Sequence, residues 1–402
     1  MTGPRVAPLR RALRVLVLVA GLAAATLASC SRPERPTGPV PAGFDVVRQD
    51  RIDTGVEHLR LRRRFPPQEA QVARISGPAR PRLRTVLAGT ALAGPAGGAP
   101  TSALCARSKC AVAVNGDFAD PAGRPVGAAV SAGELVTTPG PEPSMTQLNL
   151  DAQGRPSIGA LRWSVELQTG GGHRLAVGSV NRPLADRPVL YTSRWGATTG
   201  TDAATVELVV GLNAGGDAAL PSGVTTARLL DLRAGGTAPI LPRTVVLAAR
   251  GAAVAELVEL WRGALATTGA GATLHVSTGG AVESVGGSPR LLPSGPFERA
   301  GPEAAPFVLD RHPRTMVGIT ATGEVLLVAV DGRQPGRSGG LALAEAASVL
   351  AGLGATEGIN LDGGGSTTFV VGGRVSNRPS EPPGERPVPS ALVVLPDGGD
   401  NR

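Results

Sequence analysis

Short apolar runs separated by Gly, Pro, Asp and Asn residues make up most of the chain. Such runs cover residues 111–114, 206–211, 244–249 and 273–277. Brief apolar stretches bounded by turn-forming residues are typical of β-strands. A longer run from Glu324 to Val330 is apolar at almost every position, which predicts a central strand covered on both faces.

Helical periodicity is found in two segments. In residues 252–264 the apolar positions fall on one helical face, and Trp261 on that face is expected in the core. A second helix is predicted after Ser338, and Gly354 stands where that helix would stop. The apolar face of this second helix comprises Leu343, Ala346, Ala347, Leu350 and Leu353. The two patterns together predict a mixed α/β (α+β) fold that is dominated by sheet and forms a single domain, and they leave the strand order open.

Acidic residues directly follow two of the predicted strands. The run that ends at Val330 leads into Asp331-Gly-Arg333, and a second apolar approach leads into Asp362 and the glycines 363–365. Three glycines contribute no side chains to a core, so we expect them to allow close approach of a ligand. They would also present backbone amides to a phosphate or sugar oxygen. A plain turn is the alternative explanation.

Two arginines, Arg311 and Arg314, flank His312 and a proline. A pair of guanidinium groups held near a rigid proline suits bidentate binding of phosphate or carboxylate oxygens. In a chain so rich in arginine, solvated surface side chains are the alternative. His312 is either a general acid or base, or a structural residue.

The formal net charge of +8 does not indicate a nucleic-acid-binding protein. Residues 1–40 hold six arginines against Glu34, so +5 of the charge lies outside the expected fold and +3 remains. Aromatic residues make up only 2% of the chain, and no basic stripe with interleaved aromatic residues is present. We therefore expect no nucleic-acid partner.

The N-terminal residues are typical of a bacterial export signal. Several arginines precede an apolar run over 15–29 that is shorter than the roughly 20 residues of a comfortable transmembrane helix. The sequence Leu27-Ala-Ser-Cys30 resembles a lipobox, whose cysteine carries a diacylglycerol. We predict a signal peptide over 1–29, a lipidated Cys30 with a Pro-rich tether over 30–43, and a folded domain over 44–396. The protein would then be exported and lipid-anchored at the extracytoplasmic face of the bacterial cell membrane, with simple secretion as the alternative.

Two further cysteines, Cys105 and Cys110, are separated by four residues. In an oxidising compartment they are predicted to close a small loop as a disulfide. Two further soft ligands are absent from the neighbouring sequence, so no metal site is predicted there.

Several motifs resemble the phosphodiester glycosidase family, which includes the enzyme that uncovers mannose 6-phosphate. The resemblance covers residues 45–395. The specific motifs are Asp331-Gly-Arg-Gln-Pro-Gly, Ser338-Gly-Gly, Asn360-Leu-Asp-Gly-Gly-Gly-Ser-Thr-Thr, Val375-Ser-Asn-Arg-Pro379 and Gly384-Glu-Arg-Pro-Val388. Supporting motifs are Ala111-Val-Ala-Val-Asn-Gly-Asp-Phe118, Val180-Asn-Arg-Pro and the segment Leu190–Gly196. The family commonly has an aromatic pair after Asn-Gly, whereas Asp117 and a single Phe118 stand here.

The resemblance implies a single catalytic domain that hydrolyses a sugar-1-phosphodiester bond in a glycan or sugar phosphate of the cell envelope or its surroundings. Glycoside hydrolysis generally uses two carboxylates. Asp362 is expected to be the nucleophile or base, and Asp331 or Asp117 the second carboxylate. Trp195, Tyr191 or Phe118 would form an apolar wall against a sugar face, and Glu385 and Arg386 would pair with each other. The expected substrate-binding residues are Asn115, Arg311, Arg314, Arg333, Asn360, Gly363, Gly364, Gly365, Ser366, Thr367 and Trp195, with Arg311 and Arg314 as a phosphate clamp.

Two other functions remain open at this stage. The same loop could serve a non-catalytic surface factor that binds or assembles phosphate-bearing polysaccharides, or a phosphodiesterase that cuts the other P–O bond. No cofactor is required by the sequence, although Asp362 leaves room for a Mg²⁺ or Ca²⁺ ion.

Overall fold

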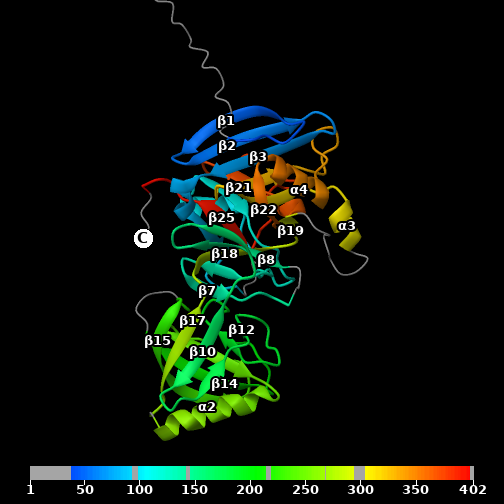
Figure 1. Ribbon diagram of the computed structural model, residues 1–402. Helices are drawn as coiled ribbons and strands as arrows, with labels where there is room; N and C mark the ends of the chain where they lie inside the picture. Colours follow the sequence, from blue (N-terminus) through cyan, green and yellow to red (C-terminus); the bar gives the residue numbers. More distant parts are fainter. Residues whose placement is uncertain are drawn as a thin grey trace, which may run out of the picture. The chain divides into compact units, whose positions relative to one another are not determined.

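The structure is a computed structural model that describes residues 38–92, 98–141, 145–213, 219–267, 269–293 and 304–398 (Figure 1). These residues belong to one compact unit, Pro36–Arg402. The predicted signal peptide, Cys30 and the first part of the predicted tether lie outside the described residues. Among the helices of the described ranges, none has both the length and the apolar character needed to cross a bilayer.

A seven-stranded antiparallel sheet organises the region that carries the predicted motifs. Its strand order is β1-β2-β3-β21-β20-β22-β19. The strands are β1 (Asp45–Asp53), β2 (Val56–Arg63), β3 (Gln68–Ile75), β19 (Arg290–Leu292), β20 (Arg314–Thr320), β21 (Val325–Val330) and β22 (Ala355–Asn360). The strand predicted to be covered on both faces is confirmed, because β21 lies between β3 and β20 and all its residues are buried.

Each face of this sheet packs against a different partner. On one face, Leu326, Val328 and Val330 share a core cluster with the buried face of α4 (Leu343–Gly352), the helix predicted after Ser338. On the other face, the alternate residues of β21 join a cluster with a five-stranded sheet of order β24-β23-β5-β25-β4. That sheet consists of β4 (Leu83–Leu87), β5 (Val112–Asn115), β23 (Phe369–Val371), β24 (Arg374–Val375) and β25 (Ser390–Val394). Gly354 follows α4 with φ 93°, as a helix-terminating glycine would.

Two more sheets complete the described fold. A five-stranded sheet contains β6 (Ala129–Ser131), β7 (Glu134–Thr137), β8 (Thr146–Asp151), β9 (Pro156–Gly159) and β18 (Ala281–Gly287). An eight-stranded sheet contains β10 (Ser164–Thr169), β11 (Arg174–Ala176), β12 (Ser179–Val180), β13 (Val189–Tyr191), β14 (Val206–Leu212), β15 (Gly223–Ala234), β16 (Thr244–Ala249) and β17 (Gly271–Ser277). The predicted helix α2 (Ala253–Thr267) packs on this sheet through Leu257 and Leu260, and Trp261 packs against the same cluster. The prediction of a mixed fold dominated by sheet is confirmed.

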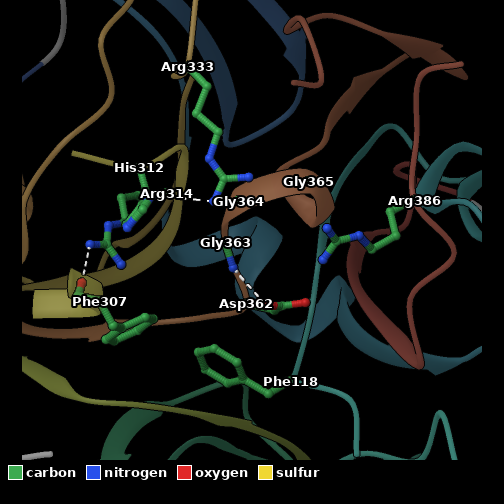
Figure 2. A pocket seen from close by; sticks show the side chains of 10 residues that line it. All are labelled: Phe118, Phe307, His312, Arg314, Arg333, Asp362, Gly363, Gly364, Gly365 and Arg386. Carbon is green, nitrogen blue, oxygen red and sulfur yellow. Dashed lines mark hydrogen bonds between the residues drawn. The ribbon is translucent and has the colours of Figure 1, made fainter. Parts of the chain in front are cut away.

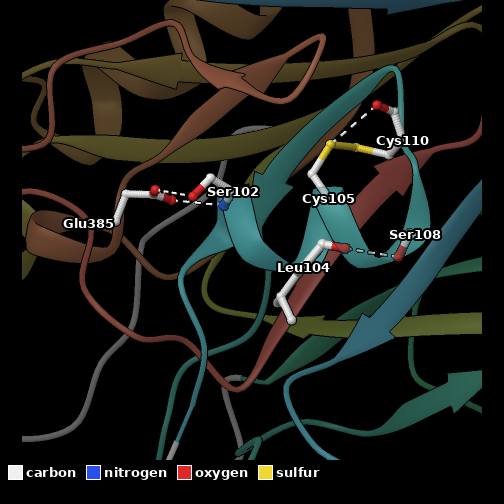
Figure 3. Close-up of a disulfide and its surroundings, with 6 residues drawn as sticks. All are labelled: Ser102, Leu104, Cys105, Ser108, Cys110 and Glu385. Atoms are coloured by element: carbon white, nitrogen blue, oxygen red, sulfur yellow. Dashed lines mark hydrogen bonds between the residues drawn. A yellow bond between two sulfur atoms is a disulfide. The ribbon is translucent and has the colours of Figure 1, made fainter.

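Two short helices were not anticipated from the sequence. These are α1 (Thr101–Ser108) and α3 (Ala304–Leu309). The predicted disulfide is confirmed, since Cys105 in α1 is bonded to Cys110, with their Cα atoms 4.9 Å apart (Figure 3). At the other end of α1, the Glu385 carboxylate accepts hydrogen bonds from the Ser102 amide, at 2.8 Å, and from the Ser102 hydroxyl. Glu385 is therefore occupied by α1 and is not paired with Arg386 as expected.

Residues 38–43, the last part of the predicted tether, contact the folded unit. The Arg74 side chain donates a hydrogen bond to the carbonyl oxygen of Pro39. Pro41 lies close against Gly352 at the end of α4.

The antiparallel order of the seven-stranded sheet brings three distant segments to one edge. Arg314, the first residue of β20, is opposite Val330, the last residue of β21. Met316 of β20 is opposite Asn360, the last residue of β22. The residues that precede β20 and those that follow β21 and β22 must therefore lie together at this edge.

Candidate active site

A cavity of about 300 Å³ opens at the edge where these three strands end (Figure 2). Its walls combine a carboxylate, three guanidinium groups, an imidazole, two phenyl rings and the glycine bend. The lining residues are Phe118, Phe307, His312, Arg314, Arg333, Asp362, Gly363, Gly364, Gly365 and Arg386. Positive charge dominates this cavity, with Asp362 as its one lining carboxylate among the described residues.

Each of the three glycines in the bend is required for a different reason. A Cβ on Gly363 would lie 2.8 Å from the carbonyl oxygen of Pro313. Gly364 has φ 60°, which side-chain-bearing residues rarely adopt, and it lies against the Arg333 guanidinium. A Cβ on Gly365 would collide with the Glu381 carboxylate. The triplet therefore lets a backbone carbonyl, a guanidinium and a carboxylate all approach one short bend.

Most amides of the bend are used within the protein, contrary to the expected anion nest. The Gly363 amide donates to the side chain of Asp362 at 2.9 Å, and the Gly364 amide donates to the Pro313 carbonyl at 2.9 Å. The amides of Ser366 and Thr367 donate to carbonyls inside the bend itself. The arginine side chains, rather than these amides, supply the groups that suit an anion.

Asp362 is held by contacts to its backbone and to its carboxylate. Its carbonyl accepts a hydrogen bond of 2.7 Å from the Asn115 side chain, and its amide donates to the Gly116 carbonyl at 3.2 Å. The Ser366 hydroxyl is hydrogen-bonded to its carboxylate, and the nearby Arg386 charge favours the ionised form. Burial outweighs these contacts and raises the pKa of the Asp362 carboxyl above its usual range.

Asp117 is a second, fully buried carboxyl whose charge interacts with that of Asp362. It accepts hydrogen bonds of 2.7 Å from the amides of Gly127 and Phe118. Burial raises the pKa of Asp117 to about 7, and the Asp362 charge adds to this shift. Arg182 lowers it, and its guanidinium also binds the carbonyls of the segment that carries Gly127. Asp117 directly precedes Phe118 in the chain and does not itself line the cavity.

Arg314 approaches the cavity from the start of β20. Although its side chain is almost fully buried, it lines the cavity and donates to the carbonyls of Leu341 and Phe307 at 2.9 Å and 2.6 Å. Its guanidinium carbon lies 4.8 Å from the centre of the Phe307 ring, a cation–π contact. Phe307 in turn packs against Phe118, with ring centres 6.2 Å apart. The two rings supply the apolar wall of the cavity.

Arg333 and Arg386 form part of the cavity rim and share a carboxylate partner, Glu381. Arg386 donates to both Glu381 oxygens, and the contact from Nε is 3.2 Å long. Arg333 Nη1 lies 3.6 Å from Oε1 of the same carboxylate. Two segments of the chain, one at Arg333 and one at residues 381–386, therefore meet through one acidic side chain.

His312 is a neutral imidazole on this rim. Its Nε2 lies 3.2 Å from the Pro306 carbonyl, which can only accept, so Nε2 carries the proton. Its Nδ1 then accepts from Arg333 at 3.3 Å. Partial burial and the charge of Arg314 lower the pKa of His312.

Asp331 is buried near the cavity but does not line it. Its carboxylate accepts from the Asn377 side chain at 3.0 Å and from the Arg378 amide at 3.0 and 3.2 Å. Burial raises its pKa. Asp331 therefore anchors the segment that follows β24.

The other predicted polar residues position the bend. The Asn115 side chain also accepts from the Thr315 hydroxyl at 2.7 Å and from the Thr368 amide at 3.1 Å. Asn360 donates to the carbonyls of Ser288 and Leu361, both at 2.8 Å. Asn360, Ser366 and Thr367 are all buried and absent from the cavity lining, so they support the bend from behind.

Arg311 and Trp195 lie away from the cavity lining. Arg311 forms an exposed ion pair with Glu345 at the start of α4, at 2.6 Å. Trp195 packs with Tyr191, and its indole donates to the Thr199 carbonyl at 2.9 Å. The expected clamp of Arg311 with Arg314 is therefore not formed, and Arg314 is accompanied instead by Arg333 and Arg386.

Two residues of the site were not singled out from the sequence. Glu381 lies in an irregular segment between β24 and β25, and Phe307 lies in α3. Neither has a local pattern that marks it, although Glu381 falls between two motifs of the resemblance. No group of three or more His, Cys, Asp or Glu side chains suited to a metal ion is found within the described ranges. The arginines around Asp362 also disfavour a cation there.

Solved structures and one family model are similar to this chain. No curated protein matches the chain significantly. A crystal structure from Burkholderia pseudomallei K96243, of a protein expected to be exported, is 28% identical, with a TM-score of 0.61 over 82% of this chain and 74% of that one. A hypothetical protein from Synechocystis is 22% identical, with a TM-score of 0.65 over 85% of this chain and 62% of that one, which shows a shared fold.

A third structure is the zebrafish N-acetylglucosamine-1-phosphodiester alpha-N-acetylglucosaminidase catalytic domain, auto-inhibited by its pro-peptide. It is 17% identical, with a TM-score of 0.44 over 90% of this chain and 85% of that one, too distant to support an argument about the site. The sequence model of the phosphodiester glycosidase family matches residues 238–395. Of the residues that line the cavity, all but Phe118 fall inside this range. The resemblance predicted from the motifs is thus confirmed over residues 238–395, which are similar to the phosphodiester glycosidase family.

Proposed function

We propose that the protein is a hydrolase that cleaves the bond between the anomeric carbon of a sugar and a phosphodiester. One observation carries the proposal: a single cavity brings a partly buried carboxylate, Asp362, together with three arginines and a wall of two phenyl rings. Guanidinium groups suit phosphate oxygens, and an aromatic face suits the apolar face of a sugar ring.

The chemistry requires little beyond these groups. Arg333 and Arg386 bind the phosphodiester oxygens, and Phe118 and Phe307 contact the sugar. Asp362 attacks the anomeric carbon or takes a proton from an attacking water. The C–O bond breaks, its electrons pass to the leaving phosphate, and the elements of water give a free sugar and a phosphomonoester.

Asp117 is the second carboxyl in this proposal. Its raised pKa of about 7 keeps it mostly protonated in mildly acidic solution and about half protonated at pH 7, and the Asp362 charge contributes to that shift. Because the charges of Asp117 and Asp362 interact, ionisation of one favours protonation of the other, which suits one acid and one base. A phosphate is a good leaving group, so proton donation contributes less here than the positive charge of the arginines.

We also propose that the protein acts outside the cytoplasm on a cell-envelope or extracellular glycan, anchored through Cys30. The N-terminal sequence, the Cys105–Cys110 disulfide and the likeness to a Burkholderia protein expected to be exported support this location. Globomycin treatment of cells that produce the full chain tests the anchor. Accumulation of an unprocessed, lipidated precursor is expected, and unchanged processing would exclude lipidation.

The activity is tested with a panel of sugar 1-(methyl phosphate) diesters, beginning with N-acetylglucosamine, in water enriched in oxygen-18. Cleavage at the anomeric carbon places the label in the released sugar. Label in the phosphate would identify a phosphodiesterase instead. Tight binding without any release would identify a binding factor.

A further inference from the structure

The Glu381 carboxylate bridges two arginines of the cavity rim. Arg386 binds both of its oxygens, and Arg333 Nη1 lies 3.6 Å from Oε1. Both arginines line the cavity, whereas Glu381 contacts them without lining it. Every charged partner of Glu381 among the described ion pairs is thus a cavity residue.

The bend is built to admit this carboxylate. A Cβ on Gly365 would collide with the Glu381 carboxyl group, so the third glycine of the triplet leaves space for it. The Glu381 side chain is 39% exposed, and its segment lies between strands rather than inside a sheet. A fixed negative charge therefore lies beside the groups that bind the anion, and it does not hold a core together.

Charge separates the substrate of the proposed reaction from its product. A phosphodiester carries one negative charge, whereas a phosphomonoester has a second pKa near 6 and carries close to two charges at neutral pH. A nearby carboxylate repels the dianion about twice as strongly as the monoanion, because the Coulomb energy is proportional to the charge. The same carboxylate already accepts two hydrogen bonds from Arg386 and forms an ion pair with Arg333.

We propose that Glu381 is a specificity residue that makes the cavity prefer a phosphodiester over a phosphomonoester and so favours release of the phosphomonoester product. This inference rests on the proposed function, since it takes the phosphodiester as the ligand. Glu381 acts through Arg333 and Arg386 and is not itself placed against the reacting carbon. Its pKa is lowered by Arg386, so it stays ionised in weakly acidic solution.

The test compares Glu381→Gln with a matched control, Glu357→Gln. Glu357 forms a similar pair with Arg290 at 2.8 Å, its side chain is 37% exposed, and it is absent from the cavity lining. The probes are dimethyl phosphate, a monoanion, and methyl phosphate, a dianion at pH 8. Their dissociation constants are measured by NMR titration on the full chain, which requires no turnover.

Glu381→Gln is expected to tighten methyl phosphate about tenfold and dimethyl phosphate about threefold, because the energetic effect scales with the ligand charge. Glu357→Gln should leave both constants within about twofold of wild type. At pH 5, where methyl phosphate is mostly a monoanion, the two probes should respond to Glu381→Gln by similar factors. Asp117, whose pKa is about 7, also titrates in this range, and at each pH its charge state is the same for both probes.

Several outcomes overturn the inference. Equal weakening of both probes by Glu381→Gln would mean that Glu381 only positions the arginines. Equal tightening of both, or absence of binding to any variant, would exclude charge selection. If the effect on binding scales with the charge of the probe but the protein hydrolyses no sugar phosphodiester, the proposed reaction is refuted. The anion selectivity of the cavity is then still supported.

Discussion

Two carboxylates in this protein occupy nearly equivalent places in the chain and differ in what surrounds them. Asp331 follows β21 and Asp362 follows β22, each directly precedes a glycine, and both strands flank β20. Burial raises the pKa of both. Yet the side chain of Asp331 is occupied by the segment at Asn377 and Arg378, whereas Asp362 lines a cavity among arginines.

The difference lies in which segment covers each strand end. The chain that follows β24 passes over Asp331 and donates to its oxygens, so this acid stabilises a loop. The chain that follows Asp362 turns away through the glycine bend (Figure 2). The charge of Arg386 acts on the Asp362 carboxylate from another segment of the chain. A buried carboxylate is thus a candidate for chemistry only where an open space adjoins it.

The largest expected effect comes from Asp362→Asn. Loss of the carboxylate should lower kcat on a sugar phosphodiester by about a thousandfold or more, because an amide is neither a nucleophile nor a base. Thermal unfolding should change little, since the amide keeps the shape of the side chain. Steady-state kinetics and calorimetry on one preparation check both parts, and retained activity would remove Asp362 from the reaction.

A second large effect is the pH dependence of stability that Asp117 causes. Its pKa is about 7 in the folded protein against 3.8 for an unperturbed group. Between these values the folded state binds more protons than the unfolded state, so the stability contributed by this carboxyl is lost as the pH rises from about 4 to about 7. The free energy of unfolding of wild type relative to Asp117→Asn should therefore fall by up to about 4 kcal/mol across that range. Urea unfolding at several pH values measures the difference, and a constant difference would contradict the shift.

Much of the sheet could be predicted from the sequence, because strand signals are local. The apolar run at 324–330 and the helical spacing after Ser338 each depend on residues within one element. The helices α1 and α3 have too few periodic positions for such a signal, with eight and six residues. Strand order depends on contacts between distant segments, which no local pattern records.

The site was predictable only in part for the same reason. Asp362, Arg314 and the glycine bend were identified from adjacent residues and do line one cavity. The sequence pattern treats Arg311 and Arg314 as equivalent. In the structure Arg311, three residues before Arg314, forms an ion pair with Glu345 and does not line the cavity. Glu381 and Phe307 belong to the site only through tertiary contacts. Glu381 contacts Arg386, and Phe307 contacts Phe118.

Asp331→Asn should affect stability and spare the chemistry, which is the reverse of Asp362→Asn. The NH₂ group of the new asparagine would face the N–H donors of Asn377 and Arg378, and two donors cannot form a hydrogen bond with each other. The free energy of unfolding should therefore fall by about 1 to 3 kcal/mol. The exposed Asp231, paired with Arg233, offers a control, since Asp231→Asn should cost less than about 0.5 kcal/mol. Denaturant unfolding gives the free energies. A thousandfold loss of kcat in folded Asp331→Asn would place that carboxyl in the reaction.

The smallest effect concerns the glycines that follow the two acids. A Cβ on Gly332 would lie 2.5 Å from the Pro313 nitrogen, whereas a Cβ on Gly365 would meet the end of the Glu381 side chain. The backbone at Pro313 cannot move aside as the flexible end of a side chain can, so Gly332→Ala should lower the melting temperature. Gly365→Ala should leave that temperature almost unchanged and lower KM about threefold, because the displaced Glu381 carboxylate would lie farther from the phosphodiester and repel it less.

Gly339→Ala completes this test, because a Cβ there would have nothing within 4 Å and the backbone does not require glycine. It should match wild type in both melting temperature and KM. If Gly365→Ala unfolded like Gly332→Ala, the bend beside Asp362 would be a structural turn like the one beside Asp331. A KM effect confined to Gly365→Ala would instead mean that the same Asp-Gly pattern serves stability after β21 and ligand binding after β22.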